Sequence, residues 1–105
     1  MKATKRAALE KAGWAVGSTD EFLELSPEER AFVDVKLALA QALRARRERK
    51  KLTQAQMARL LGSSQPRVAM MEAGDGSVTV DLLVRSLFAI GATQKDLAKV
   101  LAGRR

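Results

Sequence analysis

The sequence predicts an all-α domain in which two short helices meet at a tight corner. Three observations support this prediction. Apolar residues recur at helical spacing from residue 27 onward, Ser or Thr precedes each helical pattern, and Gly62 interrupts the pattern between residues 54 and 73. A glycine adopts the left-handed conformation that such a corner needs at little steric cost. Two helices joined in this way can present the second helix to the DNA major groove.

Composition limits what the chain can do. A chain of 105 residues makes one domain. Because the sequence has no Cys and no His, we expect no thiolate or imidazole metal site and no histidine base, and we predict no metal or cofactor. The other polar residues form no grouping of nucleophile and base, so we do not expect an enzyme. Neither a long apolar run nor a signal peptide is present, which predicts a cytoplasmic protein without membrane contact.

The charge of the chain favours a polyanionic partner. Lys and Arg number 19 against 12 Asp and Glu, a formal net charge of +7. Residues 20–34 contain six acids and one base, which sums to −5, whereas residues 44–51 contain six bases and one acid, which sums to +5. A charge run is usually a solvated helix face, but beside the predicted corner the phosphate-binding interpretation is favoured.

The first part of the chain is predicted to be an N-terminal extension, residues 1–26, to a domain of residues 27–105. Residues 1–12 have weak helical periodicity, and we expect a frayed helix or disorder there. Trp14 and Val16 alternate as in a short strand. A short helix over residues 20–25, capped by Ser18 or Thr19, should follow.

A long helix should begin after Ser26 and run to about Lys50. Ser26 is a suitable cap, Pro27 fits the first turn, and Glu29 completes a capping box. At about 100° per residue, the apolar side chains of this helix fall within one broad arc. They are Phe32, Val33, Leu37, Leu39, Ala40 and Leu43.

Arg47 falls in the same arc, where a charge is costly unless a carboxylate meets it. Glu72 is the acid that the pattern offers, because it is adjacent to Met71 and one turn beyond Val68 on the second corner helix. We therefore predict an ion pair between Arg47 and Glu72. The alternative is that both side chains extend to solvent independently.

The corner itself spans residues 54–73. Thr53 with Gln56 forms a capping-box pattern before the first helix, and Ser64 is the cap of the second. Ala58 is small enough for the place where the two helices approach most closely. The expected inward positions are Met57, Leu60, Leu61, Val68 and Met71.

Two further helices should follow the corner. The first, residues 80–90, is capped by Thr79 or Ser77 and ended by Gly91; it is apolar over more than half its circumference, so we expect it to be deeply buried or shared with another subunit. The second, residues 94–102, follows Thr93. Its sequence TQKDLAKVLA echoes TQAQMARLLG at the corner, which we attribute to shared helix-start chemistry.

The corner residues together resemble the XRE family, the helix-turn-helix domains of phage-repressor type, over about residues 37–91. The residues that carry this resemblance are Leu52, Thr53, Gln54, Met57, Ala58, Leu61, Gly62, Ser64, Gln65, Val68, Glu72, Ala73 and Gly74. Upstream, residues 14–17 (WAVG) and 21–26 (EFLELS) resemble a narrower group, the HigA-like antitoxins of bacterial toxin-antitoxin modules. The resemblance implies a compact five-helix phage-repressor-like domain with an N-terminal extension and a C-terminal helix.

The family resemblance also implies roles for individual residues. Gln65 and Arg67 would contact base edges and Met70 would face a thymine methyl group, whereas Pro66 offers no N–H and contributes by shape. Gln54 would bond a phosphate and pack against Gln65. The remaining expected phosphate contacts are Ser64, Lys50, Lys51 and Arg59.

The leading hypothesis is a homodimeric antitoxin that binds a DNA operator, represses its own operon in the bacterial nucleoid and neutralises a ribonuclease-type toxin. The expected toxin contacts are Trp14, Phe22, Leu23 and Phe32. The expected dimer contacts are Leu83, Leu87, Phe88 and Ile90. Two alternatives stay open: a stand-alone XRE-type transcriptional repressor, and a protein-bridging, coactivator-like module that does not contact bases.

Overall fold

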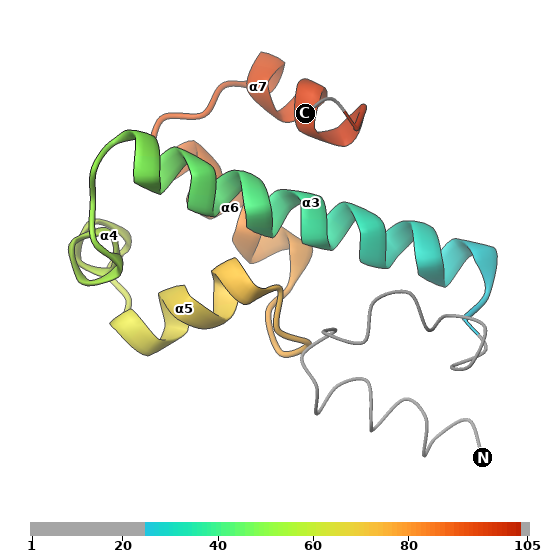
Figure 1. Cartoon of the computed structure of the whole chain (residues 1–105), viewed down its shortest axis with the longest axis horizontal. Helices are drawn as coiled ribbons and strands as arrows, with labels where there is room; N and C mark the ends of the chain where they lie inside the picture. Colours follow the sequence, from blue (N-terminus) through green and yellow to red (C-terminus); the bar gives the residue numbers. More distant parts are fainter. Residues whose placement is uncertain (1–24, 104–105) are drawn as a thin grey trace.

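The structure, a computed structural model, describes residues 25–103. In this range all regular secondary structure is helical, which confirms the all-α fold (Figure 1). The five helices are α3 (Pro27–Arg49), α4 (Gln54–Leu61), α5 (Gln65–Ala73), α6 (Val80–Ala89) and α7 (Gln94–Leu101). The strand expected at Trp14 to Val16 and the helix expected at residues 20–25 lie outside the described residues. None of the described helices is long and apolar enough to cross a membrane.

Helix α3 is the central element of the fold. It packs against α5, α6 and α7, and α4 packs against α5 and α6. In Figure 1, α7 lies on one side of α3 whereas α4 and α5 lie on the other. The helix-turn-helix corner and the C-terminal helix are therefore separated by α3.

The predicted capping residues determine where the helices begin. The Ser26 hydroxyl accepts a hydrogen bond from the Glu29 amide at 3.1 Å, and the Glu29 carboxylate accepts one from the Ser26 amide at 2.9 Å. Thr53 with Gln56, and Thr93 with Asp96, form the same reciprocal pairs at α4 and α7. The two similar segments of the sequence thus share their helix-start chemistry, as expected. Thr79 rather than Ser77 caps α6.

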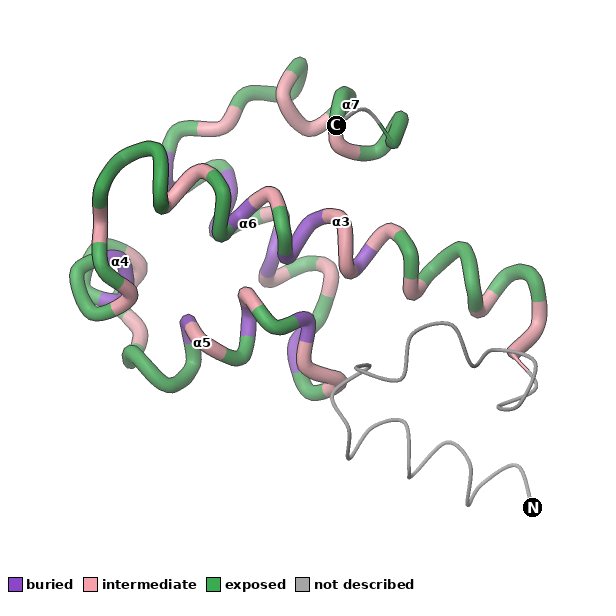
Figure 2. The backbone as a smooth tube through the Cα atoms, in the orientation of Figure 1, coloured by how far each residue is buried: buried purple, intermediate pink, exposed green. Residues whose placement is uncertain are grey.

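The core lies between α3 and the three helices that follow it. Its fully buried side chains are Leu39, Leu43, Met57, Val68, Met71, Val78 and Leu83. Figure 2 shows buried residues on α3, α4, α5 and α6, whereas α7 has none. Helix α5 approaches α3 closely at Gly74, where an added Cβ atom would lie 2.7 Å from Leu37 Cδ2.

Two expected core positions are exposed, and one unexpected position is buried. Leu60 is 65% exposed because Met57, Ala58 and Leu61 form the inward face of α4, and Leu60 lies about 100° from its middle. Phe32 is exposed because the N-terminal end of α3 extends beyond α5 and α6 (Figure 1). Lys36, in the middle of the apolar arc of α3, is only 3% exposed.

The α3–α4 connection contains the one non-glycine residue with a positive φ angle among residues 25–103. Lys50 ends α3 with a right-handed conformation, and Lys51 follows with φ 59°. This left-handed residue lets the Leu52 amide donate to the Arg47 carbonyl oxygen at 3.1 Å. A lysine is sterically strained in this conformation, whereas a glycine is not.

Lys51→Gly is therefore expected to raise the free energy of unfolding by about 1 kcal/mol, because the left-handed strain disappears. Lys50→Gly is the matched control, since it removes the same charge from a helical conformation and should lower stability by up to about 1 kcal/mol. Urea unfolding followed by circular dichroism measures both. Equal losses in the two variants would contradict the strain at Lys51.

Candidate nucleic-acid interface

Helix α5 exposes one side and anchors the other. Its cap, Ser64, accepts a hydrogen bond from the Arg67 amide at 3.3 Å, and Pro66 lies in the first turn, where a missing amide costs little. Val68 and Met71 are fully buried in the core. The four residues that the sequence predicted to contact bases are all exposed on this helix: Gln65, Pro66, Arg67 and Met70.

The expected ion pair between Arg47 and Glu72 is present in the structure. Arg47 Nε lies 2.5 Å from Glu72 Oε2, and Nη2 lies 3.1 Å from Oε1, so the contact is bidentate. The two side chains are 12% and 4% exposed. Arg47 Nη1 also donates to the Leu52 carbonyl oxygen at 2.8 Å. The hydrogen bond that Arg47 donates to Glu72 raises the pKa of the guanidinium, which stays charged.

Two glutamines continue this contact towards the surface. Gln54 Nε2 donates to Glu72 Oε1 at 3.1 Å, and Gln65 Nε2 donates to Gln54 Oε1 at 2.6 Å. We call Arg47, Glu72, Gln54 and Gln65 the buried-to-surface chain. Gln54 was expected to pack against Gln65, whereas the bond from Gln54 to Glu72 was not predicted. No pattern in the sequence pointed to that bond, because a glutamine amide has many possible partners.

The residues expected to contact phosphates occupy different places. Ser64, Lys51 and Arg59 are exposed around the corner, and Gln54 is half-buried at the start of α4. Lys50 is exposed too, but its Nζ atom lies 3.7 Å from the position that a Cβ atom would take at Gly91. The Lys50 ammonium group thus lies over the turn between α6 and α7.

The loop after α5 is held by Lys36, a residue that was not among the predicted site residues. Lys36 Nζ lies 3.4 Å from the Gly76 carbonyl oxygen, and burial lowers the pKa of this lysine while the nearby Asp75 opposes the shift. The Asp75 carboxylate accepts bonds from the hydroxyl and the amide of Ser77, which hold its pKa below the usual range. The position of Lys36 on the apolar arc, between Leu43 and Ala40 at about 100° per residue, could have indicated its burial.

The expected dimer contacts need correction. Leu83, Leu87 and Ile90 are buried in the core of a single chain, because α6 packs its apolar side against α3. They cannot contact a partner without opening that core. Of the four residues predicted, only Phe88 is exposed. Of the expected toxin contacts, Phe32 is exposed, and Trp14, Phe22 and Leu23 lie outside the described residues.

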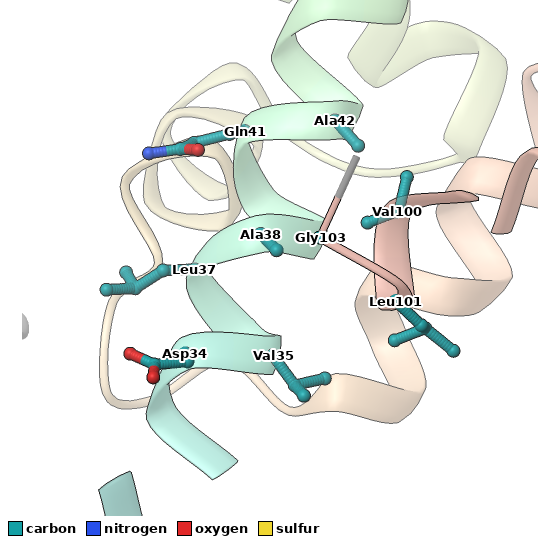
Figure 3. Close-up of a pocket in the computed structure, with 9 residues that line it drawn as sticks. All are labelled: Asp34, Val35, Leu37, Ala38, Gln41, Ala42, Val100, Leu101 and Gly103. Atoms are coloured by element: carbon teal, nitrogen blue, oxygen red, sulfur yellow. The ribbon is translucent and has the colours of Figure 1, made fainter. Parts of the chain in front are cut away.

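A groove of about 550 Å³ lies between α3 and α7, away from the corner (Figure 3). Its lining residues are Asp34, Val35, Leu37, Ala38, Gln41, Ala42, Val100, Leu101 and Gly103. The polar groups of Asp34 and Gln41 lie at its α3 edge, whereas the α7 side is apolar (Figure 3). The groove contains none of the residues expected to contact DNA.

Arg47→Met is expected to lower the free energy of unfolding by about 3 to 5 kcal/mol, because it leaves the Glu72 carboxylate buried without its cation. The double variant Arg47→Met, Glu72→Met should recover most of that loss, since no buried charge remains. Arg44→Met is the control: its ion pair with Glu48 is exposed, and the loss should stay below about 1 kcal/mol. Urea unfolding measures all three, and similar losses for Arg47→Met and Arg44→Met would argue against the role of burial.

A family model described as a helix-turn-helix domain matches residues 38–102, more than half of the chain. The comparison with curated proteins gave no match, and neither did the comparison with solved structures. The matched range contains α4 to α7 and the C-terminal part of α3, and thus the complete corner. This agrees with the corner that the sequence predicted and the structure contains. The chain belongs to the helix-turn-helix domain family.

Proposed function

We propose that the protein binds double-stranded DNA in a sequence-specific way and that α5 is the helix that enters the major groove. The exposed side of α5 carries this proposal, because Gln65, Arg67 and Met70 project from a helix whose opposite side is fixed in the core. A glutamine amide matches an adenine edge, an arginine matches guanine or phosphate, and a methionine suits a thymine methyl group. Pro66 lies among them without an N–H group to donate.

The charges around the corner support the same function. Lys51 and Arg59 are exposed, Ser64 lies at the N-terminus of α5, and the whole chain has a formal net charge of +7. Contacts from such groups to phosphates supply affinity and salt dependence but little sequence preference. The location of Lys50 over the α6–α7 turn makes it a weaker candidate than Lys51 for a phosphate contact at the corner.

Gln65→Ala is expected to reduce the preference for one base pair of the selected operator by about 1 to 3 kcal/mol. Lys51→Ala should weaken binding to all sequences similarly, because it removes a phosphate contact. The slope of log K against log salt concentration should become less steep by about 1. The left-handed strain at residue 51 persists in this variant. Selection from a random DNA pool followed by fluorescence anisotropy measures both effects. If neither substitution changes binding, the protein-bridging module becomes the better explanation.

We further propose that two copies bind a palindromic operator and repress transcription of the operon that encodes them. A dimer places its recognition helices about 34 Å apart, one turn of DNA, so the selection experiment should return two inverted half-sites at that spacing. Such a dimer has to use exposed residues of the domain, and Phe88 is the exposed large apolar residue of α6. A single half-site would favour a monomer.

The narrower proposal, that the protein is an antitoxin that neutralises a ribonuclease-type toxin, is supported by the resemblance of residues 14–17 and 21–26 and by the acids between residues 20 and 34. A stand-alone repressor is the alternative. These two functions share the DNA-binding surface and differ only in the protein partner.

The tagged full chain, purified from its native host, is expected to carry a discrete second protein with ribonuclease activity. Deletion of residues 1–25 should release that protein, because Trp14, Phe22 and Leu23 are removed, while DNA binding through α5 persists. Retention of the partner by the deletion variant would contradict the placement of its contacts. If no second protein co-purifies with the chain, the stand-alone repressor is favoured.

A further inference from the structure

We propose that a second copy of this chain packs antiparallel along the groove between α3 and α7, so that the acidic start of α3 in each copy contacts the basic end of α3 in the other. The proposal rests on the proposed function, in which two copies bind one operator, and it names the surface by which they join. That surface lies on the side of α3 away from α4 and α5, so it leaves the corner accessible to DNA (Figure 1).

The middle of the groove is apolar and only partly covered within one chain. Val100 and Leu101 of α7 lie across it from Val35, Ala38 and Ala42 of α3 (Figure 3). Leu101 is 51% exposed, and α7 has no fully buried residue. Because burial of apolar surface is favourable, a partner that covers this groove would gain free energy from it.

The two ends of the groove carry opposite charges. Asp34 lines the end nearer the start of α3, and Glu28 is exposed less than two turns before it. Towards the end of α3 the groove continues into a hollow of about 180 Å³, with which it shares Ala42 and Val100. The charged residues that line this hollow are three bases and one acid: Arg46, Arg49, Lys99 and Asp96. The order along the groove is therefore acidic, apolar and basic.

The two charged ends cannot meet within one chain. At about 1.5 Å per residue, α3 holds Glu28 and Arg46 about 27 Å apart along its axis. Asp20 is the most distant acid of the block at residues 20–34, and even an extended chain carries it only about 17 Å from Leu25. Opposite charges can thus meet only between two copies, and only if their α3 helices run in opposite directions.

The position of the groove gives the register of the two helices. Helix α3 spans Pro27–Arg49, and its groove-lining residues run from Asp34 to Ala42, so both ranges are centred on Ala38. A two-fold axis at Ala38 therefore superimposes the grooves and brings the first turns of each α3 beside the last turns of the other. Such an interface uses the same patch on both copies, as two-fold homodimers do.

Reversal of charge tests the proposal in the absence of DNA. The acid-reversed variant carries Glu28→Lys and Asp34→Lys, and the base-reversed variant carries Arg49→Glu and Lys99→Glu. All four residues are exposed. The matched control is Asp81→Lys, because Asp81 is the second residue of α6 as Glu28 is the second residue of α3. Sedimentation equilibrium of the full chain measures the dissociation constant of the dimer, and circular dichroism verifies that each variant is folded.

Each reversed variant alone is expected to raise the dissociation constant of the dimer about tenfold or more, because like charges then face each other at both ends. An equimolar mixture of the two reversed variants should form a heterodimer, and the chain with all four substitutions should regain the homodimer, since opposite charges meet again. Asp81→Lys should leave the dissociation constant unchanged. Added salt should weaken the unsubstituted dimer.

A dimer that both reversed variants retain unchanged would overturn the proposal. If Phe88→Ala dissociates that dimer instead, the contact lies on α6. A four-substitution chain that stays monomeric, or a mixture that forms no heterodimer, would also overturn the antiparallel arrangement.

The outcomes with and without DNA separate this proposal from the proposed function. A chain that is monomeric without DNA but still selects two inverted half-sites would overturn the interface and leave operator binding in place. A dimer with the expected dependence on charge that selects no DNA sequence would overturn the proposed function and leave the interface in place.

Discussion

The bidentate contact between Arg47 and Glu72 is the interaction on which the corner depends. The guanidinium group also binds the carbonyl oxygen of Leu52, so one side chain connects α3, the turn that follows it and the end of α5. A charge that is almost fully buried tolerates few alternative arrangements, because any other geometry leaves it without a partner. The orientation of α5 relative to α3 is thereby specified by a polar contact as well as by packing.

Apolar packing and polar contacts have different roles in α5. Val68 and Met71 attach the helix to the core, and hydrogen bonds connect its Glu72, through Gln54, to its first residue, Gln65. The exposed side then needs few contacts of its own. With Pro66 in the first turn, the proposed sequence preference depends on Gln65, Arg67 and Met70, and the spacing of two bound copies adds to it.

Most of the fold could be predicted from the sequence because its determinants are local. The caps at Ser26, Thr53 and Thr93 and the helical periodicity of the apolar residues are visible in short windows of the chain, and they give helices close to those observed. The exposure of Phe32 depends on how far α3 is covered by its neighbours, and that of Leu60 depends on which side of α4 faces the core. No local window contains either fact. The burial of Leu87 and Ile90 in a single chain was ambiguous for the same reason, since an apolar helix serves a core or an interface equally well.

The candidate site also has one part that could be predicted from the sequence and one part that could not. The Arg47–Glu72 pair was predictable because a charge on an apolar face requires a partner. The bond from Gln54 to Glu72 was not, because a glutamine amide has many possible partners. The sparse anchoring of α7 has a different consequence. That helix has no fully buried residue and is attached to α3 by the partly buried Arg46–Asp96 pair and by half-buried Leu97 and Val100. Its amide protons should therefore exchange through local opening, at a lower free energy than those of α3 and α5. The corner is thus firmly attached to the core, whereas the C-terminal helix is expected to open before the rest of the domain.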